Sequence, residues 1–131
     1  MANVELAEGT DLTIDFDKRN GFVPCIVQDV SDGEILMLAY VNDLALETTF
    51  DKGMATFWST SRNELWTKGE TSGDFLKIVE VLIDCDQDAL VYRVEPKGAG
   101  ACHTKDAEGA TRRSCFYRSV DVGTRRLQFG A

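Results

Sequence analysis

The sequence has no apolar segment long enough to cross a membrane. A transmembrane helix needs roughly 20 consecutive apolar residues, and polar residues interrupt every apolar run among these 131 residues. Residues 1–8 are acidic and lack the apolar core of a secretory signal. These absences predict a cytoplasmic protein that does not contact membranes.

Basic residues are also scarce. The chain has 14 lysines and arginines against 22 acidic residues, which gives a formal net charge of -8. Because nucleic acids and anionic membrane surfaces bind basic proteins, we expect neither as a partner. A small anionic ligand remains compatible with this charge, since a bound divalent cation can bridge carboxylates to phosphates.

Only four cysteines and one histidine are present. In a cytoplasmic protein, cysteines are more often free thiols or metal ligands than disulfides. No Cys-x-x-Cys pair occurs, so the zinc-ribbon signature is missing. Cys25 lies in an apolar segment and is expected in the core.

The alternation of apolar segments and turns predicts one α+β domain over residues 1–131, with mainly antiparallel strands and one or two helices. Residues 1–13 and 121–131 are weakly patterned and are expected to be peripheral arms. Segment 34–41 is almost wholly apolar, so we expect both of its faces to be covered. Strands are predicted at 22–30, 34–41, 54–59, 78–85, 89–95 and 111–120, and a helix from Asn42 or Asp43 to Gly53.

Asp84, Asp86 and Asp88 alternate with Cys85 and Gln87 between two apolar segments. Carboxylates this dense repel one another unless a cation neutralises them. Hard oxygen donors suit Mg²⁺ or Ca²⁺, whereas a thiolate suits Zn²⁺. In a straight strand the first and last aspartates would lie about 13 Å apart, so either the hairpin tip curls or only two carboxylates contact the metal. An acidic tip exposed to solvent is the alternative.

Cys102 and Cys115 follow downstream, beside His103 and Ser114. With Cys85 they would supply three thiolates, and three protein ligands with an open fourth position are typical of catalytic zinc. Such a zinc generates hydroxide near neutral pH, and His103 is the candidate base beside it. Buried free thiols and an ordinary loop histidine are the alternatives.

Several motifs follow one another in a consistent order: residues 20–24, 37–40, 57–73, 84–88, 101–104 and 114–116. Together they resemble the phosphoribosyl-AMP cyclohydrolase family of histidine biosynthesis, over residues 14–120. The resemblance implies hydrolytic opening of the adenine ring of phosphoribosyl-AMP at the N1–C6 bond. It implies an intertwined homodimer whose zinc ligands come from both chains. The implied ligands are Cys85, Cys102 and Cys115 for Zn²⁺, and Asp84, Asp86 and Asp88 for Mg²⁺.

A substrate of this kind carries two phosphates, so an acidic protein needs Mg²⁺ and local donors to hold it. His103 would shuttle the proton when water adds at C6. The two tryptophans would either stack on the purine or belong to the core, and Arg62 is favoured for its fork geometry. The expected substrate contacts are Trp58, Ser59, Ser61, Arg62, Trp66, Lys68, Thr71, Ser72 and Arg112.

Residues 105–110 depart from the family pattern, in which the Cys-His-Thr motif is followed closely by Gly-Arg-Arg-Ser-Cys. Because residues 112–115 resume that pattern intact, we interpret the departure as a loop insertion. The alternative function is a structural zinc-binding dimerisation module with an acidic partner-binding hairpin. The donor-rich segment 58–73 argues against that module, which has no use for it.

Overall fold

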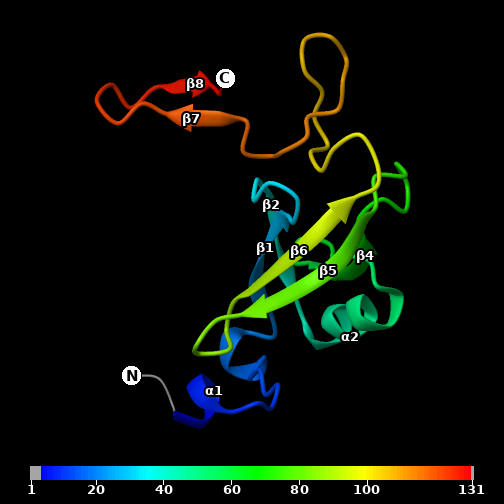
Figure 1. Ribbon diagram of the computed structural model, residues 1–131, viewed down its shortest axis with the longest axis vertical. Helices are drawn as coiled ribbons and strands as arrows, with labels where there is room; N and C mark the ends of the chain where they lie inside the picture. The colour runs from blue at the N-terminus through cyan, green and yellow to red at the C-terminus, as the bar shows by residue number, and fades with distance from the viewer. Residues whose placement is uncertain (1–3, 131) are drawn as a thin grey trace.

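A four-stranded sheet is the centre of the fold (Figure 1). The computed structural model describes residues 4–130. The strands stand in the order β2-β1-β6-β5, where β1 and β6 are parallel and the two outer pairs antiparallel. Their bounds are β1 Val23–Asp29, β2 Ile35–Val41, β5 Leu76–Ile83 and β6 Leu90–Pro96. The predicted α+β class with mainly antiparallel strands is confirmed.

Helix α2 (Asp43–Lys52) begins and ends where its sequence predicts. The side chain of Asn42 accepts a hydrogen bond from the N–H of Ala45 at 2.8 Å, which caps the first turn. Gly53 has a φ of 71° and ends the helix in the left-handed conformation. The other helices are short: α1 (Val4–Glu8) and the 3₁₀ helix η1 (Asp17–Arg19). Within residues 4–130 no helix has the length and apolarity to span a bilayer.

The core lies between α2, strand β3 (Thr56–Ser59) and one face of the large sheet. Alternate residues of β1 are buried, as expected for a strand with one covered face. Cys25 is fully buried among them, which confirms its predicted place in the core. Burial raises the pKa of its thiol, so Cys25 stays protonated at neutral pH. The largest buried side chains are Tyr92, Phe57, Leu36, Leu76 and Leu90.

The donor-rich segment after β3, where no strand is predicted, contains a strand, β4 (Glu64–Thr67). It pairs with β3 in antiparallel register, and Trp66 lies opposite Phe57 with their ring centroids 4.9 Å apart. This aromatic pair stabilises four residues that are flanked by turn-forming residues. The donor-rich segment therefore consists of two turns on either side of a short hairpin strand.

The predicted strand at 111–120 is wrong for most of its length. Only β7 (Arg118–Val120) is extended and paired, with β8 (Leu127–Phe129) from the tail. The residues before β7 cross the start of β2 instead. The hydroxyl of Ser114 donates to the carbonyl of Ile35 at 2.7 Å. The N–H of Cys115 donates to the carbonyl of Leu36 at 2.7 Å. The β7–β8 hairpin stands apart from the sheet (Figure 1).

The outer face of the large sheet is apolar and open within the described chain. One row of side chains crosses all four strands through the register Leu38–Ile26–Val91–Leu82. Three of these, Leu38, Ile26 and Leu82, are 45%, 38% and 43% exposed. The expectation that both faces of residues 34–41 are covered therefore does not hold within a single chain, because only the inner face meets the core.

Candidate functional site

A pocket of about 570 Å³ opens beside the β3–β4 hairpin. It brings His103 to residues that lie more than thirty positions earlier in the chain. The predicted residues that line it are Ser59, Ser61, Arg62, Trp66, Lys68, Thr71, Ser72 and His103. The sequence predictions did not include Thr67, Gly69 and Glu70, which also line the pocket and lie inside the same motif.

The turn after β3 shapes part of the rim of this pocket. In this turn the hydroxyl of Ser59 accepts the N–H of Arg62 at 3.2 Å, and Asn63 closes the turn with a φ of 52°. Arg62 makes only an exposed contact of 3.5 Å to Glu64. Exposed ion pairs of this kind contribute little, so the guanidinium is free to turn toward an anionic ligand.

A second hollow of about 380 Å³ adjoins the pocket. Both are lined by Trp66, Lys68 and His103, and the second also reaches Cys115 and Phe116. The remaining lining residues are Met37, Leu38 and Ala101. A ligand in the donor-rich pocket would thus extend toward the cysteines past His103.

Cys102 and Cys115 lie together beside this hollow. Backbone bonds join their segments: the N–H of Cys102 donates to the carbonyl of Arg112 at 3.1 Å. Burial opposes the charged form of Cys102, but donors from Thr104 and Cys115 outweigh it and lower the pKa of the Cys102 thiol. The hydroxyl of Thr104 lies 2.9 Å from Sγ of Cys102. Desolvation and the neighbouring Cys102 raise the pKa of Cys115 to about 11.

Cys85 does not join them within one chain. It lies at the β5–β6 tip, at the opposite end of that ribbon from residues 100–117 (Figure 1). The length of β6 separates the two places by roughly 20 Å. Across residues 4–130, no three histidine, cysteine, aspartate or glutamate side chains converge on a point that could hold a metal ion.

The acidic tip is curled, which is one of the two geometries that the sequence allowed. Oδ1 of Asp84 accepts the N–H groups of Asp88 at 2.9 Å and Ala89 at 3.2 Å. Burial opposes ionisation of Asp84, but these donors outweigh it and lower its pKa. The hydrogen bond to Asp84 and the adjacent negative charge raise the pKa of Asp88. Two carboxyl groups therefore meet at the tip.

Comparison with known proteins adds the decisive observation. The family model described as phosphoribosyl-AMP cyclohydrolase matches residues 37–117. The chain belongs to this family. A phosphoribosyl-AMP cyclohydrolase from Cenarchaeum symbiosum is 50% identical over 107 residues, which cover 82% of this chain and 93% of that protein. Proteins of the same name from Desulfatibacillum aliphaticivorans and Methanothrix thermoacetophila are 47% and 46% identical, over 84% and 92% of this chain and 83% and 85% of their own lengths.

Membership in this enzyme family confirms the resemblance that the motifs predicted. Residues 105–110, interpreted above as an insertion, form a loop between Cys102 and Cys115. Lys105 and Thr111 form an isolated bridge at its base, and the Lys105 ammonium donates to the Thr111 hydroxyl at 2.9 Å. Oδ1 of Asp106 accepts two backbone N–H groups inside the loop. The loop over residues 105–110 therefore closes on itself, and Lys105 and Thr111 pair at its base.

Two predicted substrate contacts lie outside the pocket. Trp58 is half-buried and packs against the core. The guanidinium of Arg112 lies 3.9 Å from the ring centroid of Tyr117 and donates to Thr104 at 3.2 Å. Arg112 is thus placed to support Thr104, the donor to Cys102.

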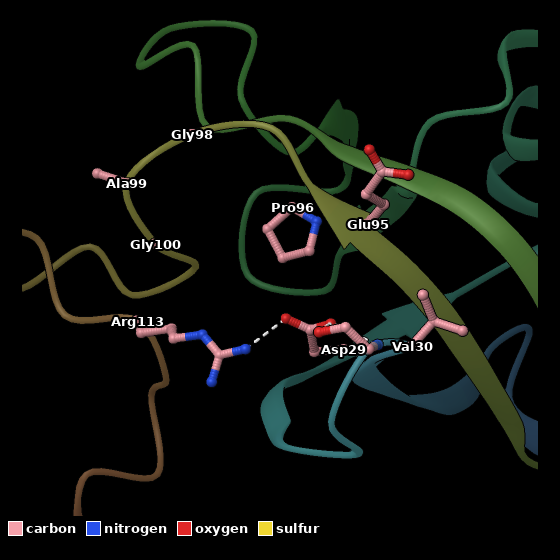
Figure 2. A pocket seen from close by; sticks show the side chains of 9 residues that line it. Asp29, Val30, Glu95, Pro96, Gly98, Ala99, Gly100 and Arg113 are labelled. Atoms are coloured by element: carbon pink, nitrogen blue, oxygen red, sulfur yellow. Dashed lines mark hydrogen bonds and ion pairs between the residues drawn. The ribbon is translucent and has the colours of Figure 1, made fainter.

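The neighbouring Arg113 is held by acidic residues instead of facing the pocket. Figure 2 shows its guanidinium directed at the carboxylate of Asp29, at the edge of a small hollow of about 260 Å³. It also contacts Asp32 at 3.0 Å and Glu34 at 2.8 Å. These contacts fix the segment before Cys115 to the β1–β2 turn, so we assign Arg113 a structural role.

Proposed function

We propose that this chain hydrolyses the adenine ring of phosphoribosyl-AMP at the N1–C6 bond, as a step of histidine biosynthesis. One observation carries the proposal: the pocket that joins the donors of residues 59–72 to His103 continues into the hollow beside Cys115. The relatives bear the name of this activity over most of their length.

The pocket suits a nucleotide in volume and in chemistry. Small-molecule sites commonly measure about 300–1,000 Å³, and this one is about 570 Å³. Arg62 and Lys68 supply positive charge in a protein whose net charge is -8. The hydroxyls of Ser59, Ser61 and Ser72 supply neutral donors for phosphate or ribose.

The thiols fit Zn²⁺. Cys102 is buried with a lowered pKa and lies against Cys115, which is a soft donor pair of the kind zinc prefers. We propose Cys85 of a second copy as the third ligand. Bound there, zinc would supply Lewis-acid activation of water. His103, which borders both hollows, would accept the proton as water adds at C6.

The acidic tip fits Mg²⁺. The carboxyl groups of Asp84 and Asp88 lie together, and hard oxygen donors are the ligands that Mg²⁺ takes. Asp86 would complete the set from the same turn. Magnesium held there by these carboxylates would neutralise the tip and would supply positive charge for the substrate's phosphates.

Two features support a homodimer. The proposed zinc ligands of one chain lie at opposite ends of the β5–β6 ribbon, and the outer face of the sheet exposes an apolar row. A second copy packed on that face would cover the row and could bring its own Cys85 tip to the paired cysteines.

Complementation between inactive variants tests both the reaction and the shared site. Cys85→Ser and Cys115→Ser proteins should each lose zinc and ring-opening activity, measured by metal analysis and by the absorbance change of phosphoribosyl-AMP. Mixing and refolding the two should restore activity, because a heterodimer contains one complete site. Cys25→Ala, in the core, should keep its zinc. Zinc retained by both serine variants would contradict the ligand assignment.

A further inference from the structure

Gln87 is buried at the end of an otherwise exposed hairpin tip. Its residue exposure is 6%, whereas Asp84, Cys85 and Asp86 beside it are exposed. Its backbone has a φ of 53°, in the left-handed region that asparagine and glycine adopt more readily. A glutamine gains nothing from that backbone conformation, so the reason for this residue lies in its side chain.

The amide of Gln87 makes three hydrogen bonds, all to the backbone of the N-terminal segment. Oε1 accepts the N–H of Thr13 at 2.7 Å. Nε2 donates to the carbonyls of Leu6 at 3.3 Å and Asp11 at 3.2 Å. One side chain thus attaches a segment more than seventy residues away to the acidic tip.

The attached segment forms one wall of a hollow of about 260 Å³ whose other wall is the tip. Residues 6–7 and 9–12 line one side, and Ile83, Asp84, Cys85 and Gln87 line the other. Arg19, from η1, adds an ion pair to Asp88. The N-terminal part of the chain therefore surrounds the residues proposed as metal ligands.

The curled tip needs such support. Like charges on Asp84 and Asp88 repel each other, and the left-handed backbone at Gln87 is itself unfavourable. Hydrogen bonds between buried groups favour the curled form, because uncurling would leave the amide without partners. Sites whose ligands are held in place beforehand bind more tightly than sites that must be ordered on binding.

We propose that Gln87 is a positioning residue, which holds the acidic tip curled for a divalent cation by anchoring it to residues 6–13. The inference rests on the proposed function for the identity of the cation site. It makes the N-terminal segment part of that site's support, through backbone groups and not through its own side chains.

The test compares Gln87→Met with the unmodified protein. Methionine keeps the length and packing of the side chain but removes all three hydrogen bonds. We expect Mg²⁺ binding, measured by titration calorimetry, to weaken about tenfold. Amide exchange at the Thr13 N–H should accelerate in the same variant. Gln128→Met, an exposed position on β8, should change neither.

Gln87→Gly provides a second variant, which removes the same hydrogen bonds but relieves the left-handed backbone. It should also lose Mg²⁺ affinity, by less than Gln87→Met. Unchanged Mg²⁺ affinity in the glutamine variants, with or without faster exchange at Thr13, would overturn the positioning role. Unmodified protein that binds no Mg²⁺ would overturn it as well. Unmodified protein that binds Mg²⁺ but fails to open the ring of phosphoribosyl-AMP would count against the proposed reaction alone.

Discussion

At the scale of single residues, charge is balanced at the acidic tip by neighbours from other parts of the chain. Asp84 is stabilised as a carboxylate by backbone N–H groups, and Asp88 pairs with Arg19. The guanidinium occupies a place beside the carboxylates that a cation would also favour. Arg19 should therefore compete with Mg²⁺ for the tip.

Arg19→Gln should tighten Mg²⁺ binding by about threefold, in line with the modest strength of an exposed ion pair. Calorimetric titration at low and moderate salt would measure the change, which should shrink as salt increases. Lys18→Gln removes the same charge one residue away. Equal effects from the two variants would show a general charge effect in place of direct competition.

Asp29 is a buried carboxylate that neighbouring donors and a guanidinium also stabilise. Burial opposes its ionisation, but the N–H and hydroxyl of Ser31 and the guanidinium of Arg113 outweigh it and lower its pKa. A lowered carboxyl pKa contributes stability above the unfolded-state value of about 3.9, and that stability is lost as the pH falls through the folded-state pKa.

Asp29→Asn should accordingly reduce the free energy of unfolding at pH 7 by about 2 kcal/mol. The difference from the unmodified protein should narrow as the pH falls below about 4, which urea unfolding at several pH values would show. Asp32→Asn, which removes an exposed partner of the same arginine, should cost much less. A difference that did not depend on pH would contradict this account.

At the scale of elements, the sequence predicted best what local residues decide. The bounds of α2 follow from Asn42 and Gly53, which act within one turn of the helix. Strand β4 could not be predicted, because it depends on pairing with β3 across a turn. The 111–120 segment was misread for the same reason, since its partners are carbonyls of β2.

The same distinction between local and long-range contacts applies to the candidate site. The pocket residues were found because they form one contiguous motif with recognisable donors. Gln87 and Arg19 were missed as parts of the tip, because their roles depend on contacts with the N-terminal segment and with Asp88. No pattern within residues 84–88 indicates that the side-chain amide of Gln87 is buried.

The turn after β4 offers a test at the scale of an element. Gly69 has a φ of 100°, and a Cβ there would lie 2.4 Å from the backbone nitrogen of Phe75. Gly69→Ala should therefore displace the turn that carries Lys68 and Thr71, lower the melting temperature and weaken substrate binding. Gly73 has a φ of 82° but open space around it, so Gly73→Ala should lower the free energy of unfolding by only about 1–2 kcal/mol. Equal effects would mean that backbone conformation alone matters.

At the scale of the whole molecule, a single described chain contains the three cysteines of the proposed zinc site but does not bring them together. Cys102 and Cys115 are joined through the backbone, whereas Cys85 belongs to a tip at the other end of β6. The family resemblance implied zinc ligands from both chains; within this chain the separation follows from the direction in which β6 runs. An apolar row on the outer face of the sheet then explains how a second copy would be held.

Ile26→Glu places a charge in the middle of that row, where Ile26 lies between Leu38 and Val91. A buried, unpaired carboxylate at a dimer interface is strongly unfavourable, so the variant should become monomeric in sedimentation analysis. It should also lose zinc and activity, although its fold and its pocket remain. Leu44→Glu, at a more exposed apolar position on α2, should stay dimeric and keep its zinc. A monomeric Ile26→Glu protein that retained zinc would contradict a zinc site shared between two chains. Within one chain, the length of β6 keeps Cys85 away from Cys102 and Cys115.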